Sequence, residues 1–191
     1  MVDLQDFKPG DLLGFSHRGC VGYGINLASR GFPGWGLSHV AMISLHPEDK
    51  TPILYESTMS APGKCLLQKK KIAGVQCRKI LSRIREYPGR VWQYPIIQPF
   101  GFIDSQLLTE WWVSRLGTAY DATGAIHCRD KSWWMRDEDL SSLFCSEAVV
   151  AAWREVNVVL VGKKSASGWS PNAVGRAVLK QGVCGYPRRL K

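Results

Sequence analysis

A cysteine at the start of an apolar helix is the residue in this chain best suited to nucleophilic chemistry. After Cys145, the residues Val149, Ala152, Trp153 and Val156 recur at helical spacing, which predicts a helix whose buried face begins at the cysteine. The thiol is therefore expected to point inward. Unpaired backbone N–H groups and the helix dipole lower the pKa of a first-turn thiol below its free value of about 8.5. A packing role is the alternative, because cysteine is among the most buried residue types.

A thiol nucleophile needs a base within hydrogen-bonding reach, and the four histidines are the candidates. His46 lies in a polar turn and is expected to be solvated, and His17 lies in a basic loop. His127 is the direct neighbour of Cys128 in an irregular segment. His39 opens an apolar strand, where a fixed imidazole could act as the base or could be a core histidine with satisfied hydrogen bonds.

A carboxylate that could orient the imidazole stands in the next apolar strand. Glu56 is a charged residue inside the run 52–58, and its burial is costly unless a partner such as a histidine across a hairpin pairs it. A register slip of one residue would put the two side chains on opposite faces, so the sequence leaves open whether His39 and Glu56 meet. Glu48 and Asp49 are surface turn residues and are not candidates.

Other chemistries find little support. The sequence has no G-x-S-x-G elbow, no phosphate-binding glycine loop and no H-E-x-x-H helix. The segment Asp137-Glu138-Asp139 is interpreted as the acidic lead-in to a helix, not as a glycosidase pair. The spacing of Cys65, Cys77, Cys128 and His127 disfavours a metal site, and we expect neither a metal nor another cofactor.

These residues must be positioned by a small sheet and several helices. The runs 38–44 and 52–58 are expected to form an antiparallel hairpin. Further strands are expected within 9–15, 64–68, 74–77, 90–96 and 183–186, and helices at 21–29, 80–87, from 104 or 105 to about 116, from 145 onward, and from 171 to about 181. Strands dominate the first half and helices the second, which predicts an α+β fold with helices against a small antiparallel sheet or barrel.

Several boundaries have specific signals. Asp104 or Ser105 is expected to cap a helix that Gly117 ends. In the helix at 80–87, Leu81 and Ile84 are expected to point inward. Ser170 followed by a proline predicts the N-cap and first residue of the last helix.

The composition fits a single globular domain over residues 1–191. With 45% hydrophobic and 21% charged residues, the chain can bury a substantial core. Its six cysteines are scattered without a C-x-x-C pair, which predicts reduced thiols. Residues 1–9 lack the basic start and apolar run of a signal peptide, and no apolar stretch reaches the ~20 residues of a membrane span. We therefore expect a cytoplasmic protein.

The strongly basic charge predicts an anionic partner without identifying it. The formal net charge is +9 and the isoelectric point about 9.4, which suits a nucleic acid, an anionic membrane or an acidic polymer. The basic clusters at 69–71 and 188–191 lack interleaved aromatics and match no nucleic-acid motif. Both clusters are interpreted as solvated surface.

Five short motifs in a fixed order carry a family resemblance. They are Pro9-Gly10-Asp11-Leu12-Leu13, Ser38-His39-Val40-Ala41-Met42-Ile43, Tyr55-Glu56-Ser57, Gly117-x-x-Tyr120-Asp121 and Phe144-Cys145-Ser146-Glu147. In this order the chain resembles the circularly permuted NlpC-type papain-like hydrolases, with the YiiX-like group as the nearest branch and lecithin:retinol acyltransferase as a more distant relative. The resemblance covers about residues 9 to 150, and the helix start at 170–172 resembles the end of the family's domain.

The resemblance implies a role for each motif residue. It would make Cys145 the nucleophile, His39 the general base and Glu56 the residue that orients the imidazole. Tyr120 matches a family tyrosine near the nucleophile, where its hydroxyl could assist the thiol or an oxyanion. The implied fold is a small antiparallel sheet or barrel packed on the cysteine-bearing helix.

The expected function is thiol-dependent cleavage of an acyl bond. The thiolate would attack a carbonyl, backbone N–H groups at the helix start would hold the oxyanion, and water would release the acyl-enzyme. The substrate could be a small peptide, a cell-wall fragment or a lipid-like ester or amide. An amine or alcohol in place of water would make the same site an acyltransferase. A noncatalytic protein that holds an anionic partner is the alternative from another class.

Overall fold

The computed structural model describes residues 3–16, 36–59, 63–123, 141–162 and 165–191. Several expectations from the sequence lie outside the described residues: the helix at 21–29, the residues His17, His127 and Cys128, and the acidic segment 137–139.

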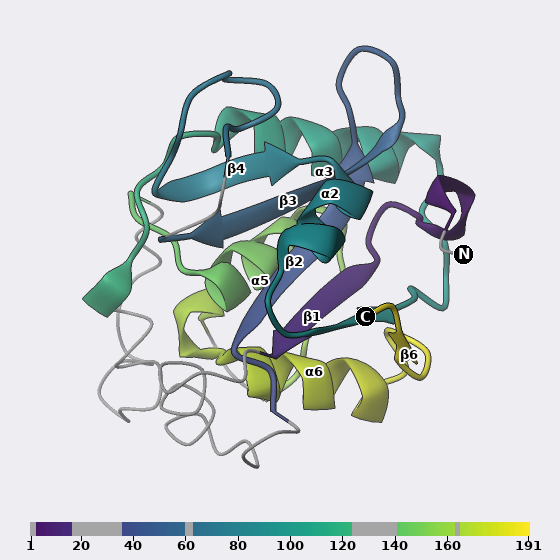
Figure 1. The fold of residues 1–191 in the computed structure, drawn as a ribbon. Coiled ribbons are helices and arrows are strands. Elements are labelled where there is room, and N and C mark those ends of the chain that lie inside the picture. The colour runs from purple at the N-terminus through teal and green to yellow at the C-terminus, as the bar shows by residue number, and fades with distance from the viewer. Residues whose placement is uncertain (1–2, 17–35, 60–62, 124–140, 163–164) are drawn as a thin grey trace.

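A six-stranded sheet in the order β4-β3-β2-β1-β5-β6 forms the centre of the fold, and every neighbouring pair is antiparallel (Figure 1). The strands are β1 (Leu12–Ser16), β2 (His39–Leu45), β3 (Pro52–Thr58), β4 (Gly74–Arg78), β5 (Arg90–Tyr94) and β6 (Arg188–Arg189). The predicted hairpin of β2 and β3 is confirmed, with Met42 opposite Tyr55. The sheet is open, with β4 and β6 at its edges.

Four α-helices and two single-turn 3-10 helices accompany the sheet. They are η1 (Leu4–Asp6), α2 (Ile80–Glu86), α3 (Phe102–Ser114), α5 (Cys145–Glu155), η3 (Ala166–Gly168) and α6 (Pro171–Lys180), among the described residues. The predicted cap of α6 is confirmed, because the Ser170 side chain accepts the Ala173 N–H. No helix in the described segments has the length and apolar character that crossing a membrane requires.

Two hydrophobic clusters cover opposite faces of the sheet. Val40 and Met42 of β2 belong to the cluster that contains Trp153 of α5. Ala41 of β2 belongs to the second cluster, which contains Ile84 of α2. Both faces of β2 are therefore buried, and this explains its nearly continuous apolar run. The predicted α+β class, with helices packed on a small antiparallel sheet, is confirmed.

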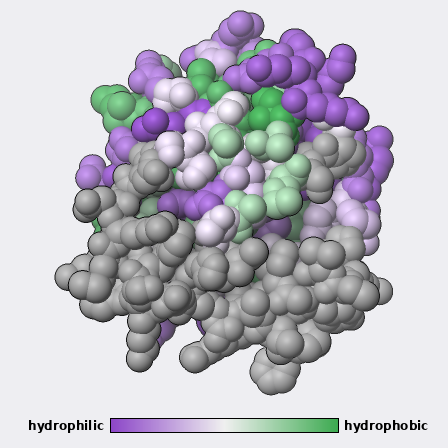
Figure 2. Space-filling model, turned by 90° about the vertical axis from the view of Figure 1, so that its left-hand side faces the viewer, coloured by the Kyte–Doolittle hydropathy of each residue, from purple (hydrophilic) through white to green (hydrophobic). Residues whose placement is uncertain are grey.

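The surface of the described residues keeps several exposed apolar side chains. Phe102 and Ile103 at the start of α3, Val161 and Tyr186 are all largely exposed. On the face drawn in Figure 2, hydrophobic patches lie among hydrophilic side chains in the upper half of the view. Such a mixture is ordinary, because apolar atoms contribute more than half of the surface of folded proteins.

Two of the predicted strands are wrong. Residues 64–68 form a turn, which the hydrogen bond from the Lys69 N–H to the Cys65 carbonyl closes with Lys69 at a positive φ. At 183–186, only Cys184 forms a bridge, to Ile96, and the last strand is β6 instead. Gly182, with φ of 65°, turns the chain just before this segment.

Two helix details also differ from the prediction. Gly101, not Asp104 or Ser105, is the N-cap of α3, and the helix begins three or four residues earlier than predicted, at the exposed Phe102. In α2, Ile84 is buried as predicted and the partly buried Leu81 packs against the same cluster, but Arg83, which was not predicted to point inward, is buried as well.

A glycine allows the segment after α3 to approach β4. Gly74 has φ of 144°, and a Cβ there would lie 1.9 Å from the Thr118 carbonyl oxygen. The Val75 N–H donates to the same oxygen at 2.9 Å. This contact holds the chain before Tyr120 against the sheet.

We expect Gly74→Ala to lower the free energy of unfolding by about 2 kcal/mol or more, because both the strained φ and the clash oppose the new methyl group. Urea unfolding measures this change. Gly101→Ala is the matched control, since a Cβ at Gly101 meets nothing within 4 Å. Equal losses in the two variants would contradict this account of Gly74.

Candidate active site

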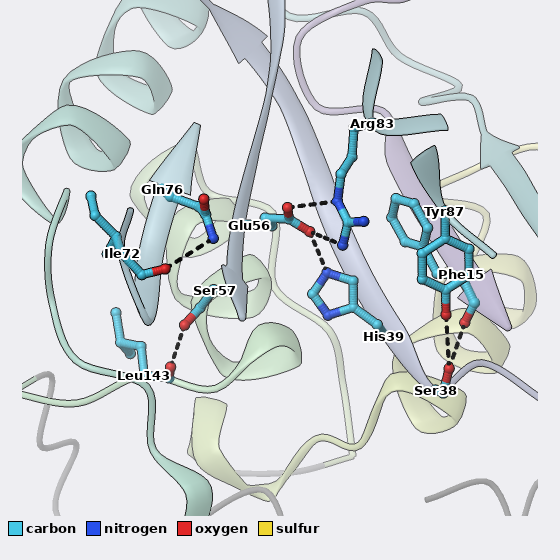
Figure 3. A network of polar contacts seen from close by, with 10 residues as sticks. All are labelled: Phe15, Ser38, His39, Glu56, Ser57, Ile72, Gln76, Arg83, Tyr87 and Leu143. Atoms are coloured by element: carbon cyan, nitrogen blue, oxygen red, sulfur yellow. Dashed lines mark hydrogen bonds and ion pairs between the residues drawn. The ribbon is translucent and has the colours of Figure 1, made fainter. Parts of the chain in front are cut away.

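His39 is the first residue of β2 and is fixed by its neighbours. Its ring lies beside Phe15 of β1, with ring centroids 5.3 Å apart. Its Nε2 lies 2.7 Å from Oε2 of Glu56 (Figure 3). The imidazole is therefore held at one nitrogen, which leaves Nδ1 for a second partner.

The strand register answers the question that the sequence left open. Because Met42 is opposite Tyr55, His39 and Glu56 both lie on the face that these two residues do not use. Glu56 is 0% exposed. A carboxylate at this depth requires partners, and His39 is one of them.

Arg83 of α2 is the second partner of Glu56, and the sequence analysis did not find it. Its Nε lies 2.8 Å from Oε1 of Glu56 and its Nη2 lies 3.0 Å from Oε2. The guanidinium is 4% exposed and stacks over the rings of Phe15 and Tyr87. A signal was present, because Arg83 falls three residues after Ile80 on the buried face of the helix. A charged residue on that face predicts a buried partner.

Cys145 begins α5 and is 4% exposed, so its side chain is buried as the helical spacing predicts. Its sulfur is hydrogen-bonded to His39 and to the backbone N–H groups of Val40 and Ser146. Burial would raise the pKa of the thiol, but the charge and hydrogen bond of His39, together with the two N–H donors, lower the pKa below its usual value.

The charges of His39 and Glu56 support each other. Burial would lower the pKa of His39, but the Cys145 thiolate and the Glu56 carboxylate outweigh burial and raise the pKa to about 9. Burial would raise the pKa of Glu56, but hydrogen bonds and charge from His39 and Arg83 lower it to about 2. At neutral pH the arrangement therefore favours an imidazolium between a carboxylate and a thiolate.

Tyr120 lies next to the segment that leads into the cysteine helix. The Leu143 N–H donates to the Ala119 carbonyl at 2.9 Å, and Ala119 bridges Ser142. The backbone thus places Tyr120 beside the residues just before Cys145. The role of its hydroxyl stays a prediction.

Buried hydrogen bonds anchor the start of α5. The Ser57 hydroxyl of β3 donates to the Leu143 carbonyl at 2.5 Å (Figure 3). The Ser146 hydroxyl donates to the Trp169 carbonyl at 2.5 Å. The first bond ties the residues just before the cysteine helix to the strand that carries Glu56, and the second ties the helix to the residue that follows η3.

Neither a scan of known protein families nor a search of curated proteins gives a match for this chain. Among solved structures, the chain is similar to the metalloprotein yiiX from Escherichia coli O157:H7, with a TM-score of 0.56 and 17% sequence identity. The match covers 82% of this chain and 70% of the other. At this identity the similarity shows a YiiX-like fold.

Proposed function

We propose that this protein is a thiol hydrolase with a permuted papain-like architecture. In this proposal Cys145 is the nucleophile, His39 is the general base and acid, and Glu56 orients the imidazole. One observation carries the proposal: a single, partly buried imidazole contacts a carboxylate through Nε2 and a thiol whose pKa is lowered. A packing cysteine has no need of such partners, whereas a nucleophile requires them.

The chemistry follows from the three side chains. The Cys145 thiolate attacks the carbonyl carbon of an amide or ester, and a C–S bond forms. His39 gives its proton to the leaving amine or alcohol as the C–N or C–O bond breaks. Water, deprotonated by His39, then attacks the thioester, which releases the acid and restores the thiolate. We assign the oxyanion to backbone N–H groups at the start of α5, because amides at a helix N-terminus favour negative charge.

The proposal also includes Tyr120, the class of substrate and the group that accepts the acyl group. The residues on either side of Tyr120, Ala119 and Asp121, form backbone hydrogen bonds with Leu143, and these bonds support a position of Tyr120 near the nucleophile. We propose a peptide, peptidoglycan-type or lipid-like acyl substrate. If an amine or alcohol replaces water in the second step, the same site transfers the acyl group.

No step of the proposed reaction involves a metal ion. The similar yiiX structure is called a metalloprotein. Among the described residues, no three His, Cys, Asp or Glu side chains are grouped to hold an ion. Nε2 of His39 and both oxygens of Glu56 are engaged with each other and with Arg83. This donor set does not fit a resident metal.

Trapping of the acyl-enzyme tests the proposal. The protein is incubated with peptide amides, peptidoglycan-type stem peptides and lipid esters, and products and intact mass are followed by mass spectrometry. We expect release of the acid and an acyl adduct on Cys145, and both disappear in Cys145→Ala. Cys184→Ala, which removes another buried thiol, retains both. Equal turnover by wild type and Cys145→Ala, or no turnover and no adduct with any of these substrates, would refute the proposal and leave the anionic-partner alternative.

A further inference from the structure

We propose that Arg83 is a positioning residue that balances the charge of the buried site, so that Cys145 can be a thiolate at neutral pH. The inference rests on the proposed roles of Cys145 and His39. Its geometric basis is the two-point contact of the Arg83 guanidinium with both oxygens of Glu56, at 2.8 and 3.0 Å, in a buried setting. In Figure 3 the guanidinium lies next to the His39 ring, and both groups contact Oε2 of Glu56.

Arg83, Glu56, His39 and Cys145 form a chain of alternating charge. With an imidazolium and a thiolate, the four charges are positive, negative, positive and negative, and the sum is zero. Buried charge is costly when it is not compensated. Without Arg83 the same protonation state would carry a net charge of −1. The protonation state of lowest free energy would then be the one with a protonated thiol, whose net charge is zero.

The other polar groups near these four side chains do not change the difference in net charge between the variants. In the described part of the molecule, Arg78 of β4 pairs with Glu86 of α2 at 2.7 Å, and their charges cancel. Burial raises the pKa of the Tyr87 hydroxyl, which stays neutral. Gln76, opposite Glu56, carries no charge. Glu147 of α5, which accepts the Phe144 N–H, is present in every variant considered below.

Charge counting predicts an order for the apparent pKa of Cys145 in three variants. Arg83→Gln leaves net −1 with the thiolate present, so the pKa rises. Glu56→Gln leaves net +1, so the pKa falls below that of wild type. The double variant Glu56→Gln/Arg83→Gln restores net zero, so the pKa returns close to the wild-type value. Damage to packing alone would move both single variants in the same direction, and the double variant further.

Alkylation of Cys145 by iodoacetamide, resolved by peptide mass spectrometry from about pH 4 to pH 9, measures this pKa without any substrate. We expect a rise of about one to two units for Arg83→Gln, which is a thiolate fraction about tenfold or more lower near the wild-type midpoint. Arg83→Lys keeps the charge and is expected to stay within about half a unit. Arg85→Gln, at an exposed position of α2, is the control and should match wild type.

If Arg83→Gln does not fold, Glu56→Gln is compared with the double variant, where the added Arg83→Gln must raise the pKa of Cys145. An unchanged pKa in Arg83→Gln, or a double variant displaced further than Arg83→Gln in the same direction, would overturn the proposal. The result is separable from the proposed function. The predicted pKa order in a protein that forms no acyl adduct would support the role of Arg83 and refute the hydrolase proposal, and an active enzyme without that order would do the reverse.

Discussion

Replacement of His39 by alanine is expected to slow alkylation of Cys145 by about a hundredfold near pH 6. The reason is that the imidazolium offsets the burial of a thiolate that is 4% exposed. Without it, burial dominates, and the pKa of the thiol rises above its ordinary value. Peptide-resolved alkylation rates measure the change. Acyl transfer to Cys145 should fall by a factor of at least about a hundred as well.

The matched control for this variant is His46→Ala. His46 directly follows β2, at the end of the strand opposite His39, and contacts Asp49 at 3.4 Å. Its loss should leave the alkylation rate of Cys145 unchanged. If His39→Ala alkylates as fast as wild type, His39 is not the partner of the thiolate, and the pairing on which the account depends is wrong.

Glu56→Ala is expected to lower the free energy of unfolding by about 3 to 5 kcal/mol. Removal of the carboxylate leaves the Arg83 guanidinium, which is 4% exposed, without the partner that its Nε and Nη2 contact. A buried charge that loses its partner costs far more than an exposed ion pair contributes. Urea unfolding near neutral pH measures the loss. Glu48→Ala, at an exposed position of the β2–β3 turn, should change stability by less than about 0.5 kcal/mol.

The loss of unfolding free energy caused by Glu56→Ala should also depend on pH. The pKa of Glu56 is lowered from 4.5 to about 2 in the folded protein, so its ionisation contributes stability that is fully present above pH 4.5. This contribution is lost as pH falls toward 2. The difference in unfolding free energy between wild type and Glu56→Ala should therefore shrink over that interval. A constant difference would show that the carboxylate charge is not what stabilises the site.

The sequence predicts the parts of the site that depend on local periodicity. The helical spacing after Cys145 correctly gives a buried face that begins at the thiol, and the two apolar runs correctly give the hairpin of β2 and β3. The class α+β follows from these elements. In contrast, whether His39 contacts Glu56 depends on the register of β2 against β3, and the sequence alone does not determine that register.

Arg83 shows what pattern reasoning misses. Apolar periodicity directs attention to Ile84 and Leu81, whereas the buried polar partner on the same helix becomes visible only when α2 packs over Glu56. The turn at 64–68 was missed for a related reason. Its conformation depends on a positive φ at Lys69 and on contacts to β4, and neither leaves an apolar pattern in the sequence.

The protonation state of His39 tests the central claim most directly, because the account requires a thiolate–imidazolium pair of Cys145 and His39. ¹⁵N NMR of the imidazole nitrogens reports this state at about pH 7.5, where a free histidine is mostly neutral. We expect wild-type His39 to carry protons on both nitrogens and to titrate only near its raised pKa of about 9. In Cys145→Ala, the pKa of His39 should fall, because the thiolate is one of the two charges that raise it. A neutral His39 in the wild-type protein at that pH, unaffected by Cys145→Ala, would contradict the account.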